Sequence, residues 1–227
     1  MDETPIPVIY QDRDLIAVNK PEGLATIPGR GSHAEDCLLF RLRRQTGGEL
    51  LVVHRLDAET SGLILFARTA AAHRRLNALF FERRVHKTYL ALVHGIIQED
   101  QFRADMPLRE FGSGRIAPDP VRGRPCVTEF LVRERFEGQT LLEAYPLTGR
   151  RHQIRAHLYA AGHPVVGDRR YGERARQEAF PRLMLHALRL DFTALSGRKL
   201  TLEVPPPPSF EEVLRALGGK TGTGTGT

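Results

Sequence analysis

Tryptophan is absent from this chain of 227 residues, and cysteine occurs only twice. Cys37 and Cys126 form no CxxC pair and show no metal-ligand spacing, which excludes cysteine-based metal centres and disulfide-rich secreted domains. Long apolar runs are also missing: GLILFA at 62–67 falls far below the roughly 20 residues that a membrane helix needs. Because no apolar leader follows the opening MDETPIPV, we expect a cytoplasmic protein that makes no membrane contact.

Lysine is scarce too. Of the 33 basic residues only those at 20, 87, 199 and 220 are lysines, so 29 are arginines. The formal net charge of +6 favours a polyanionic partner. Arginine binds phosphate through two parallel hydrogen bonds, so its excess is typical of nucleic-acid binding. A GC-rich genome that encodes basic residues as arginine explains the excess equally well.

Hydrophobic patterning predicts more strands than helices, without a regular alternation of the two. This is typical of an α+β fold with a mostly antiparallel sheet. Helices are predicted at about 34–45, at 69–84, from a cap at Thr148 to Gly162, and after a capping-box pair formed by Ser209 and Glu212. Strands are predicted at 14–18, 50–53, 62–67, 87–94, 125–134, 140–146, 183–192 and 199–204.

No linker divides the chain, and its apolar content of 41% is sufficient for a sizeable core. We therefore expect one domain over residues 5–217. Residues 218–227, which end in TGTGTGT, are predicted to be a disordered low-complexity tail. The polar stretch 98–123 shows no periodicity and is predicted to be an exposed excursion.

The first segment that could support chemistry is HRLDAETSG at 54–62. Its carboxylate, Asp57, leaves the end of a predicted buried strand, with Arg55 before it and a glycine-containing turn after it. Loops held by rigid strands often bear catalytic groups. The same cluster of Asp, Thr and Ser also suits ordinary turn hydrogen bonding, so both interpretations stay open.

The second segment, TGRRHQIRAH at 148–157, places three arginines and two histidines at a predicted helix start. Arg151 and Arg155 are four apart and are predicted to share a helix face. The histidines are five apart and there is no HExxH pattern, so a zinc site is not expected. The segment is predicted to be a phosphate-binding helix terminus, an arginine that holds a carboxylate, or a solvated basic face.

Two further features are weaker. The loop at 162–172 has three glycines and a proline, and its role is predicted to be architectural. Tyr89, on the strand predicted at 87–94, suits either the core or a stacking surface for a base.

Taken together, these segments resemble the RluA-type pseudouridine synthases. HRLDAETSGLILFART at 54–69 is similar to the active-site signature of that family, and four other blocks follow its order. These blocks are KPEGLATIPGRG at 20–31, KTYLALVHG at 87–95, TGRRHQIRAHLYAAGHPVVGDRRYG at 148–172 and LMLHALRL at 183–190.

The resemblance implies a bent, mostly antiparallel sheet with flanking helices and a central active-site cleft. It also implies the isomerisation of uridine to pseudouridine within RNA, without a cofactor. Asp57 matches the catalytic aspartate, as nucleophile or as initiator of a glycal route. Tyr89 matches the tyrosine that stacks on the target base, and Arg155 matches the basic residue that pairs with the aspartate.

The resemblance further implies substrate-binding roles. Arg55 matches an arginine that fills the gap left by a flipped nucleotide, and Leu185 matches an apolar wall of the pocket. Near the same site we expect His54, Arg150 and His152 to contact substrate. Before residue 14 we expect no room for an S4-like RNA-binding module. The arginines of 98–123 and its edge are therefore candidate RNA contacts: Arg103, Arg109, Arg115, Arg122 and Arg124.

The expected partner is rRNA or tRNA, or both, and neither DNA nor a membrane. We expect a monomer. One alternative is a non-catalytic RNA-binding or RNA-folding factor on the same scaffold. Another is a hydrolase that uses Asp57 with His54 or His152, although no nucleophile–base pattern supports it.

Overall fold

The computed structural model describes residues 4–29 and 36–218. The chain forms two compact units. The first comprises Met1–Lys87 with Ala187–Val204, and the second comprises Thr88–His186 with Pro205–Thr227. The predicted single domain over 5–217 stays a prediction. Apart from Gly218, the tail predicted to be disordered lies outside the described residues.

The first unit is built around strands in the order β1 (Val8–Gln11), β2 (Leu15–Lys20), β4 (Ser61–Ala67) and β11 (Leu185–Thr193), the last of which enters this unit at Ala187. β1 and β2, and β2 and β4, pair antiparallel. β3 (Leu51–Val52) pairs with β4, and β12 (Lys199–Glu203) pairs with β11. All seven residues of β4 are buried, which explains its uninterrupted apolar sequence.

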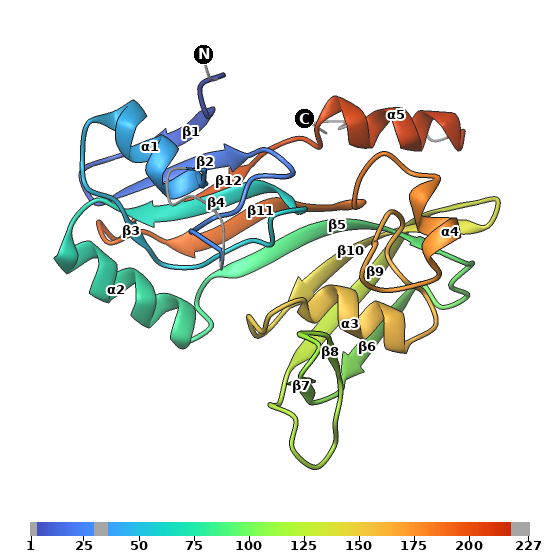
Figure 1. The fold of residues 1–227 in the computed structure, drawn as a ribbon. Helices are drawn as coiled ribbons and strands as arrows, with labels where there is room; N and C mark the ends of the chain where they lie inside the picture. The colour runs from blue at the N-terminus through green and yellow to red at the C-terminus, as the bar shows by residue number, and fades with distance from the viewer. Residues whose placement is uncertain (1–3, 30–35, 219–227) are drawn as a thin grey trace. The chain divides into compact units, whose positions relative to one another are not determined.

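Two helices cover these strands, with α1 (Leu38–Thr46) above and α2 (Ala70–Phe81) below in Figure 1. Thr69 caps α2, since its side chain accepts a hydrogen bond from the Ala72 N–H at 3.1 Å. The apolar side of α2 buries Leu76 and Leu79 in a core shared with Leu63 and Leu65 of β4. The helix is thereby fixed against the strand that follows the HRLDAETS segment.

The second unit has the strand order β5 (His86–His94), β10 (Gln139–Pro146), β9 (Val127–Phe136) and β6 (Gln101–Asp105). β7 (Leu108–Glu110) and β8 (Ile116–Pro118) form a separate hairpin. α3 (Gln153–Ala160) contacts β8, β9 and β10, as Figure 1 shows. α4 (Arg174–Glu178) and α5 (Pro208–Ala216) complete the unit, and Phe210 of α5 is fully buried in its core.

The fold class is α+β with a mostly antiparallel arrangement, as predicted. Eight predicted strands and four predicted helices are present with shifted ends. The stretch 98–123, predicted to be an exposed excursion without periodicity, contains β6, β7 and β8, and many of its residues are exposed. No helix within residues 4–29 and 36–218 is long and apolar enough to cross a membrane.

Two predicted helix caps were wrong. α3 begins at Gln153, and the Thr148 hydroxyl donates to Gln153 Oε1 at 2.6 Å instead of capping the helix. Ser209 lies inside α5, where its hydroxyl accepts from Arg182 Nη1 at 3.2 Å. In both cases the hydroxyl forms a hydrogen bond with another side chain. The predicted end of α3 at Gly162 is confirmed by the positive φ of 84° there.

Candidate functional site

Asp57 lies in the turn that joins β3 to β4 and is half-buried. The carbonyl of Asp57 accepts a hydrogen bond from the Thr60 N–H at 3.2 Å, which closes the turn. Its neighbour Leu56 is buried and fixed at both backbone groups by Thr26. The Thr26 hydroxyl donates to the Leu56 carbonyl at 2.9 Å and accepts from the Leu56 N–H at 3.2 Å. The turn is thus rigid on the side that enters Asp57.

Lys20 fixes the other side of the same turn. Its side chain is fully buried, and Nζ donates to the carbonyls of Pro21, Leu24 and Ala58 at 2.8, 2.8 and 3.0 Å. Three carbonyl acceptors match the three protons of an ammonium group and offset the cost of burying it. The Lys20 ammonium group therefore lies at the backbone of Ala58, the residue that follows Asp57. No role was predicted for Lys20 from the sequence, although it directly follows an apolar strand and opens the KPEGLATIPGRG block.

Gly62 allows β4 to approach β11 closely. Its φ is +114°, and a Cβ at this position would overlap the backbone of Ala187. A glycine is required here for both reasons, since other residues rarely adopt this conformation. The signature glycine therefore has a packing role in addition to its place in the turn.

His54 is part of the framework of the same segment. Its Nε2 accepts a hydrogen bond from the Leu65 N–H at 3.0 Å, and its ring stacks on Phe80 at 4.6 Å between centroids. Burial, assisted by the charge of Lys87, lowers the pKa of His54 to about 3. Burial, with a smaller contribution from the charge of Arg83, also lowers the pKa of Lys87, to about 8. A pKa of about 3 makes His54 a weak base, and its Nε2 lone pair already accepts the Leu65 N–H, so both observations argue against His54 as the base of a hydrolase.

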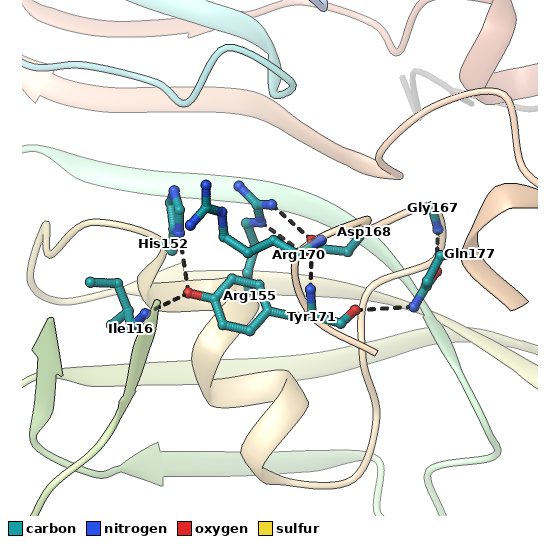
Figure 2. Close-up of polar contacts among 8 residues, drawn as sticks. All are labelled: Ile116, His152, Arg155, Gly167, Asp168, Arg170, Tyr171 and Gln177. Atoms are coloured by element: carbon teal, nitrogen blue, oxygen red, sulfur yellow. Dashed lines mark hydrogen bonds and ion pairs between the residues drawn. The ribbon is translucent and has the colours of Figure 1, made fainter. Parts of the chain in front are cut away.

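Arg155 of α3 is held by Asp168 (Figure 2). Nε and Nη2 of Arg155 donate to Asp168 Oδ2 and Oδ1 at 2.7 and 2.8 Å, and both side chains are almost completely buried. Oδ1 also accepts the backbone N–H groups of Arg170 and Tyr171. Arg155 therefore holds a carboxylate, and that carboxylate belongs to Asp168. The pairing of Arg155 with Asp57 that the family resemblance implies stays a prediction. The sequence contains no local signal for this pair, because Arg155 and Asp168 are 13 residues apart.

The predicted shared face of Arg151 and Arg155 was wrong. α3 begins only at Gln153, so Arg151 precedes the helix and is exposed. It forms an ion pair with Glu110 of β7. Arg155, in contrast, is 2% exposed, which excludes the solvated basic face for this residue.

Tyr171 connects the Arg155 pair to the β7–β8 hairpin. Its hydroxyl accepts from the Ile116 N–H at 3.0 Å and lies 3.1 Å from Nδ1 of His152 (Figure 2). The guanidinium of Arg155 lies over the Tyr171 ring at 5.4 Å. Burial raises the pKa of the Tyr171 phenol. His152 itself is buried and adopts a left-handed φ of 50°, a conformation that is rare without glycine.

Gln177 fixes the loop that carries Asp168. Its Oε1 accepts the Gly167 N–H at 2.7 Å and lies 3.1 Å from His94 Nε2, and its Nε2 donates to the Tyr171 carbonyl at 3.2 Å. Figure 2 shows this amide between the two ends of the loop. At Gly167, φ is +74° and a Cβ would overlap the Arg182 carbonyl, so glycine is required. The loop is architectural, as predicted, and its architecture orients Arg155.

The predicted site residues are distributed over both units. Asp57, His54 and Arg55 belong to the first unit, while Tyr89, Arg150, His152, Arg155 and Leu185 belong to the second. Arg55 and Arg150 are exposed, Tyr89 is half-buried on β5, and Leu185 is buried in the core of its unit. Among the described residues, no group of three His, Cys, Asp or Glu side chains could hold a metal ion. The roles assigned to these residues stay predictions.

Comparison with known proteins identifies the family. The family model described as RNA pseudouridylate synthase matches residues 14–160. The chain belongs to this family. The predicted fold class and reaction class of a pseudouridine synthase are thereby confirmed.

Individual relatives agree with this assignment. The chain is 39% identical over 216 residues to the dual-specificity RNA pseudouridine synthase RluA of Vibrio cholerae. This match covers 92% of this chain and 88% of that protein. It is 37% identical over 219 residues to the ribosomal large subunit pseudouridine synthase C of Pasteurella multocida, covering 92% and 67% respectively. The solved structure of human RNA pseudouridylate synthase domain containing 1 has a TM-score of 0.77 and 30% identity, and covers 97% of this chain and 98% of that one.

Proposed function

We propose that this pseudouridine synthase acts on rRNA or tRNA and that Asp57 is its catalytic carboxylate. The observation that carries the proposal is the turn that presents Asp57. Lys20 and Thr26 fix the backbone on both sides of it, and the Asp57 side chain is half-buried. A carboxylate on a rigid turn beside a buried ammonium is suited to attack or to charge stabilisation, because its position needs no reorganisation during the reaction.

The reaction exchanges one bond to the ribose for another. The bond from C1′ to N1 of uracil breaks, the base rotates, and C1′ bonds to C5, while the proton of C5 leaves and N1 gains one. A protein can reach this glycosidic bond only after the uridine leaves its stack. We assign Tyr89 to stack on the extruded base and Arg55 to occupy the gap that the base leaves, as the family resemblance implies.

Arg155 supplies fixed positive charge in this scheme. Its bidentate pair with Asp168 uses Nε and Nη2 and holds the guanidinium plane in one orientation. Asp168, Tyr171 and Gln177 are therefore proposed to act as positioning residues for Arg155. The substrate contacts predicted for Arg150, His152, His54 and Leu185 stay predictions.

The arginines near the β7–β8 hairpin differ in how far their charge is free for phosphate. Arg103 pairs with Asp105 at 3.1 Å, and Arg109 pairs with Asp119 at 3.2 Å. Arg115 lies over the Tyr159 ring at 4.8 Å, and Arg122 and Arg124 are exposed. We therefore favour Arg122 and Arg124 over Arg103 and Arg109 as RNA contacts. Action on RNA alone and not on DNA, a monomeric state and a cytoplasmic location stay predictions.

The experiment is to incubate cellular RNA with the wild-type protein and with Asp57→Asn, and then to map pseudouridine chemically. We expect new pseudouridine at defined positions of rRNA or tRNA with wild type and none with the variant. Equal modification by both proteins would contradict the role of Asp57. RNA binding by wild type without any modification would favour the alternative of an RNA-binding factor.

A further inference from the structure

Helix α2 ends in an aromatic side chain that is almost fully exposed. Phe81 is 89% exposed, whereas its neighbour Phe80 is half-buried. An isolated exposed apolar residue is common on protein surfaces and needs no explanation. The surroundings of Phe81 therefore decide whether its exposure has a function.

These surroundings are basic. Arg74 and Phe81 are seven residues apart, so they lie on the same face of α2, and the small side chain of Ala78 lies between them. Arg83 and Arg84 follow the helix, and all of these residues are exposed. We call this group the α2 surface: Arg74, Ala78, Phe81, Arg83 and Arg84. Arg84 pairs with Glu82 at 3.3 Å, whereas within the described residues neither Arg74 nor Arg83 forms a salt bridge.

Arg83 occupies a position that favours glycine. Its φ is +58°, and the Arg84 N–H donates to the Leu79 carbonyl at 2.9 Å, which together form a Schellman ending of α2. Glycine is the usual residue there because it has no Cβ to oppose a left-handed conformation. An exposed arginine at this position gives the fold no internal contact in return, so its side chain is better explained by an external anion.

The α2 surface adjoins the segment that carries Asp57. Phe80, beside Phe81, stacks on the His54 ring at 4.6 Å, and His54 is three residues before Asp57. His54 also accepts the Leu65 N–H, so the end of α2, the signature segment and β4 form one packed assembly within the first unit.

We propose that the α2 surface binds single-stranded RNA next to the target uridine, with a base stacked on Phe81 and phosphates bound by Arg74 and Arg83. An aromatic face with arginines beside it is the combination that single-stranded nucleic acid requires, because every base has a face to stack and every linkage carries a negative charge. The inference rests on the proposed function for the identity of the ligand. It adds a contact region outside the catalytic residues.

The test uses two variants of the full chain, neither of which is expected to impair folding. Phe81→Ala removes an exposed ring. Arg83→Gly removes a charge and relieves the left-handed conformation, so its stability should equal or exceed that of wild type. Affinity for a short oligouridylate is measured by fluorescence anisotropy, and turnover is measured on an RNA that wild type modifies. We expect about a tenfold weaker affinity for Phe81→Ala, because stacking contributes on the order of 1–3 kcal/mol per base.

Both variants should raise KM and leave kcat near the wild-type value, since the lost contact holds ground state and transition state alike. For Arg83→Gly, the salt dependence of binding should also become shallower by about one phosphate contact. Matched controls are Val8→Ala, which removes another exposed apolar side chain of the first unit, and Arg13→Ala, which removes another exposed charge of that unit. Both should bind like wild type.

Wild-type affinity in both α2 variants overturns the inference and points to a protein partner for this surface. Equal weakening in Arg13→Ala and Arg83→Gly also overturns it, since net charge would then explain the loss. These outcomes differ from a failure of the proposed function, which is the absence of pseudouridine in the wild-type reaction.

Discussion

Single residues hold the candidate catalytic groups in place through buried charge. The Arg155–Asp168 pair is bidentate and almost completely buried, so neither partner can leave it without exposing an unpaired charge to an apolar environment. Lys20 shows the same principle with neutral partners, because three carbonyls surround its ammonium. Each buried charge thus stabilises one local geometry: Lys20 that of the turn that carries Asp57, and Asp168 that of the Arg155 side chain.

Asp168→Asn tests this role of the pair. The amide keeps the shape of the carboxylate but leaves the Arg155 charge without its counter-charge, so we expect unfolding to become easier by about 3 kcal/mol. Urea denaturation measures this loss. In the folded variant kcat should fall more than KM rises, because Arg155 loses its orientation. The control Glu178→Gln breaks an exposed pair with Arg174 and should leave stability and kcat near wild type. A loss of stability with unchanged kcat would limit Asp168 to a structural role.

His54 makes stability depend on pH. Its pKa is about 3 in the folded protein and near 6.5 when unfolded, so the unfolded chain binds the extra proton as the pH falls through 6.5. The contribution of His54 is complete above that pH and is lost below it. Between about pH 7 and about pH 5.5 we expect a loss of about 1 kcal/mol from this residue. Urea denaturation at both values should show a smaller difference in His54→Gln; an identical difference would contradict the buried neutral ring.

At the scale of strands and helices, close packing between strands positions the turn that carries Asp57. β4 follows the turn directly, and the contact of Gly62 with Ala187 of β11 has no room for a side chain. Thr26 and Lys20, which precede α1 in the chain, bind the backbone of Leu56 and of Ala58, the residues before and after Asp57. The turn is thus determined by three separate segments of the first unit.

Gly62→Ala should therefore be severely destabilising. The new Cβ would overlap the Ala187 backbone and force an unfavourable φ, and we expect a loss of more than about 3 kcal/mol. Thermal unfolding measures the change. Gly48→Ala is the matched control, because Gly48 has open space around its Cβ position and no left-handed φ. Similar unfolding of the two variants would contradict the packing role of Gly62.

Sequence periodicity was sufficient for the elements that bury an apolar face and insufficient for those that depend on distant partners. β4 and α2 were predicted nearly to their ends because their own residues form the core. β8 was missed since its Ile116 N–H is bound by Tyr171, 55 residues away. Asp57 and Arg155 were candidates because of their residue types beside a predicted strand and helix, and the family resemblance implied their roles. Lys20 and Asp168 were not candidates, because their contacts are with residues distant in the sequence.

For the whole molecule, the basic net charge is consistent with an RNA substrate. Ion pairs between individual arginines and carboxylates determine which of these arginines can bind phosphate. The net charge is +6, yet Arg103, Arg109 and Arg151 are each paired with a carboxylate. Arg74 and Arg83, which the sequence analysis did not single out, form no salt bridge within the described residues. Membership of the pseudouridylate synthase family defines the reaction, and these local differences define where RNA is expected to bind.

The most direct test of the account compares wild type and Asp57→Asn on one purified RNA that wild type modifies. Single-turnover pseudouridine formation and RNA affinity are measured on the same preparations, and circular dichroism confirms folding. We predict that Asp57→Asn stays folded, binds the RNA within a few fold of wild type and forms no pseudouridine. Pseudouridine formation by the variant at the wild-type rate would contradict the assignment of Asp57 as the catalytic carboxylate.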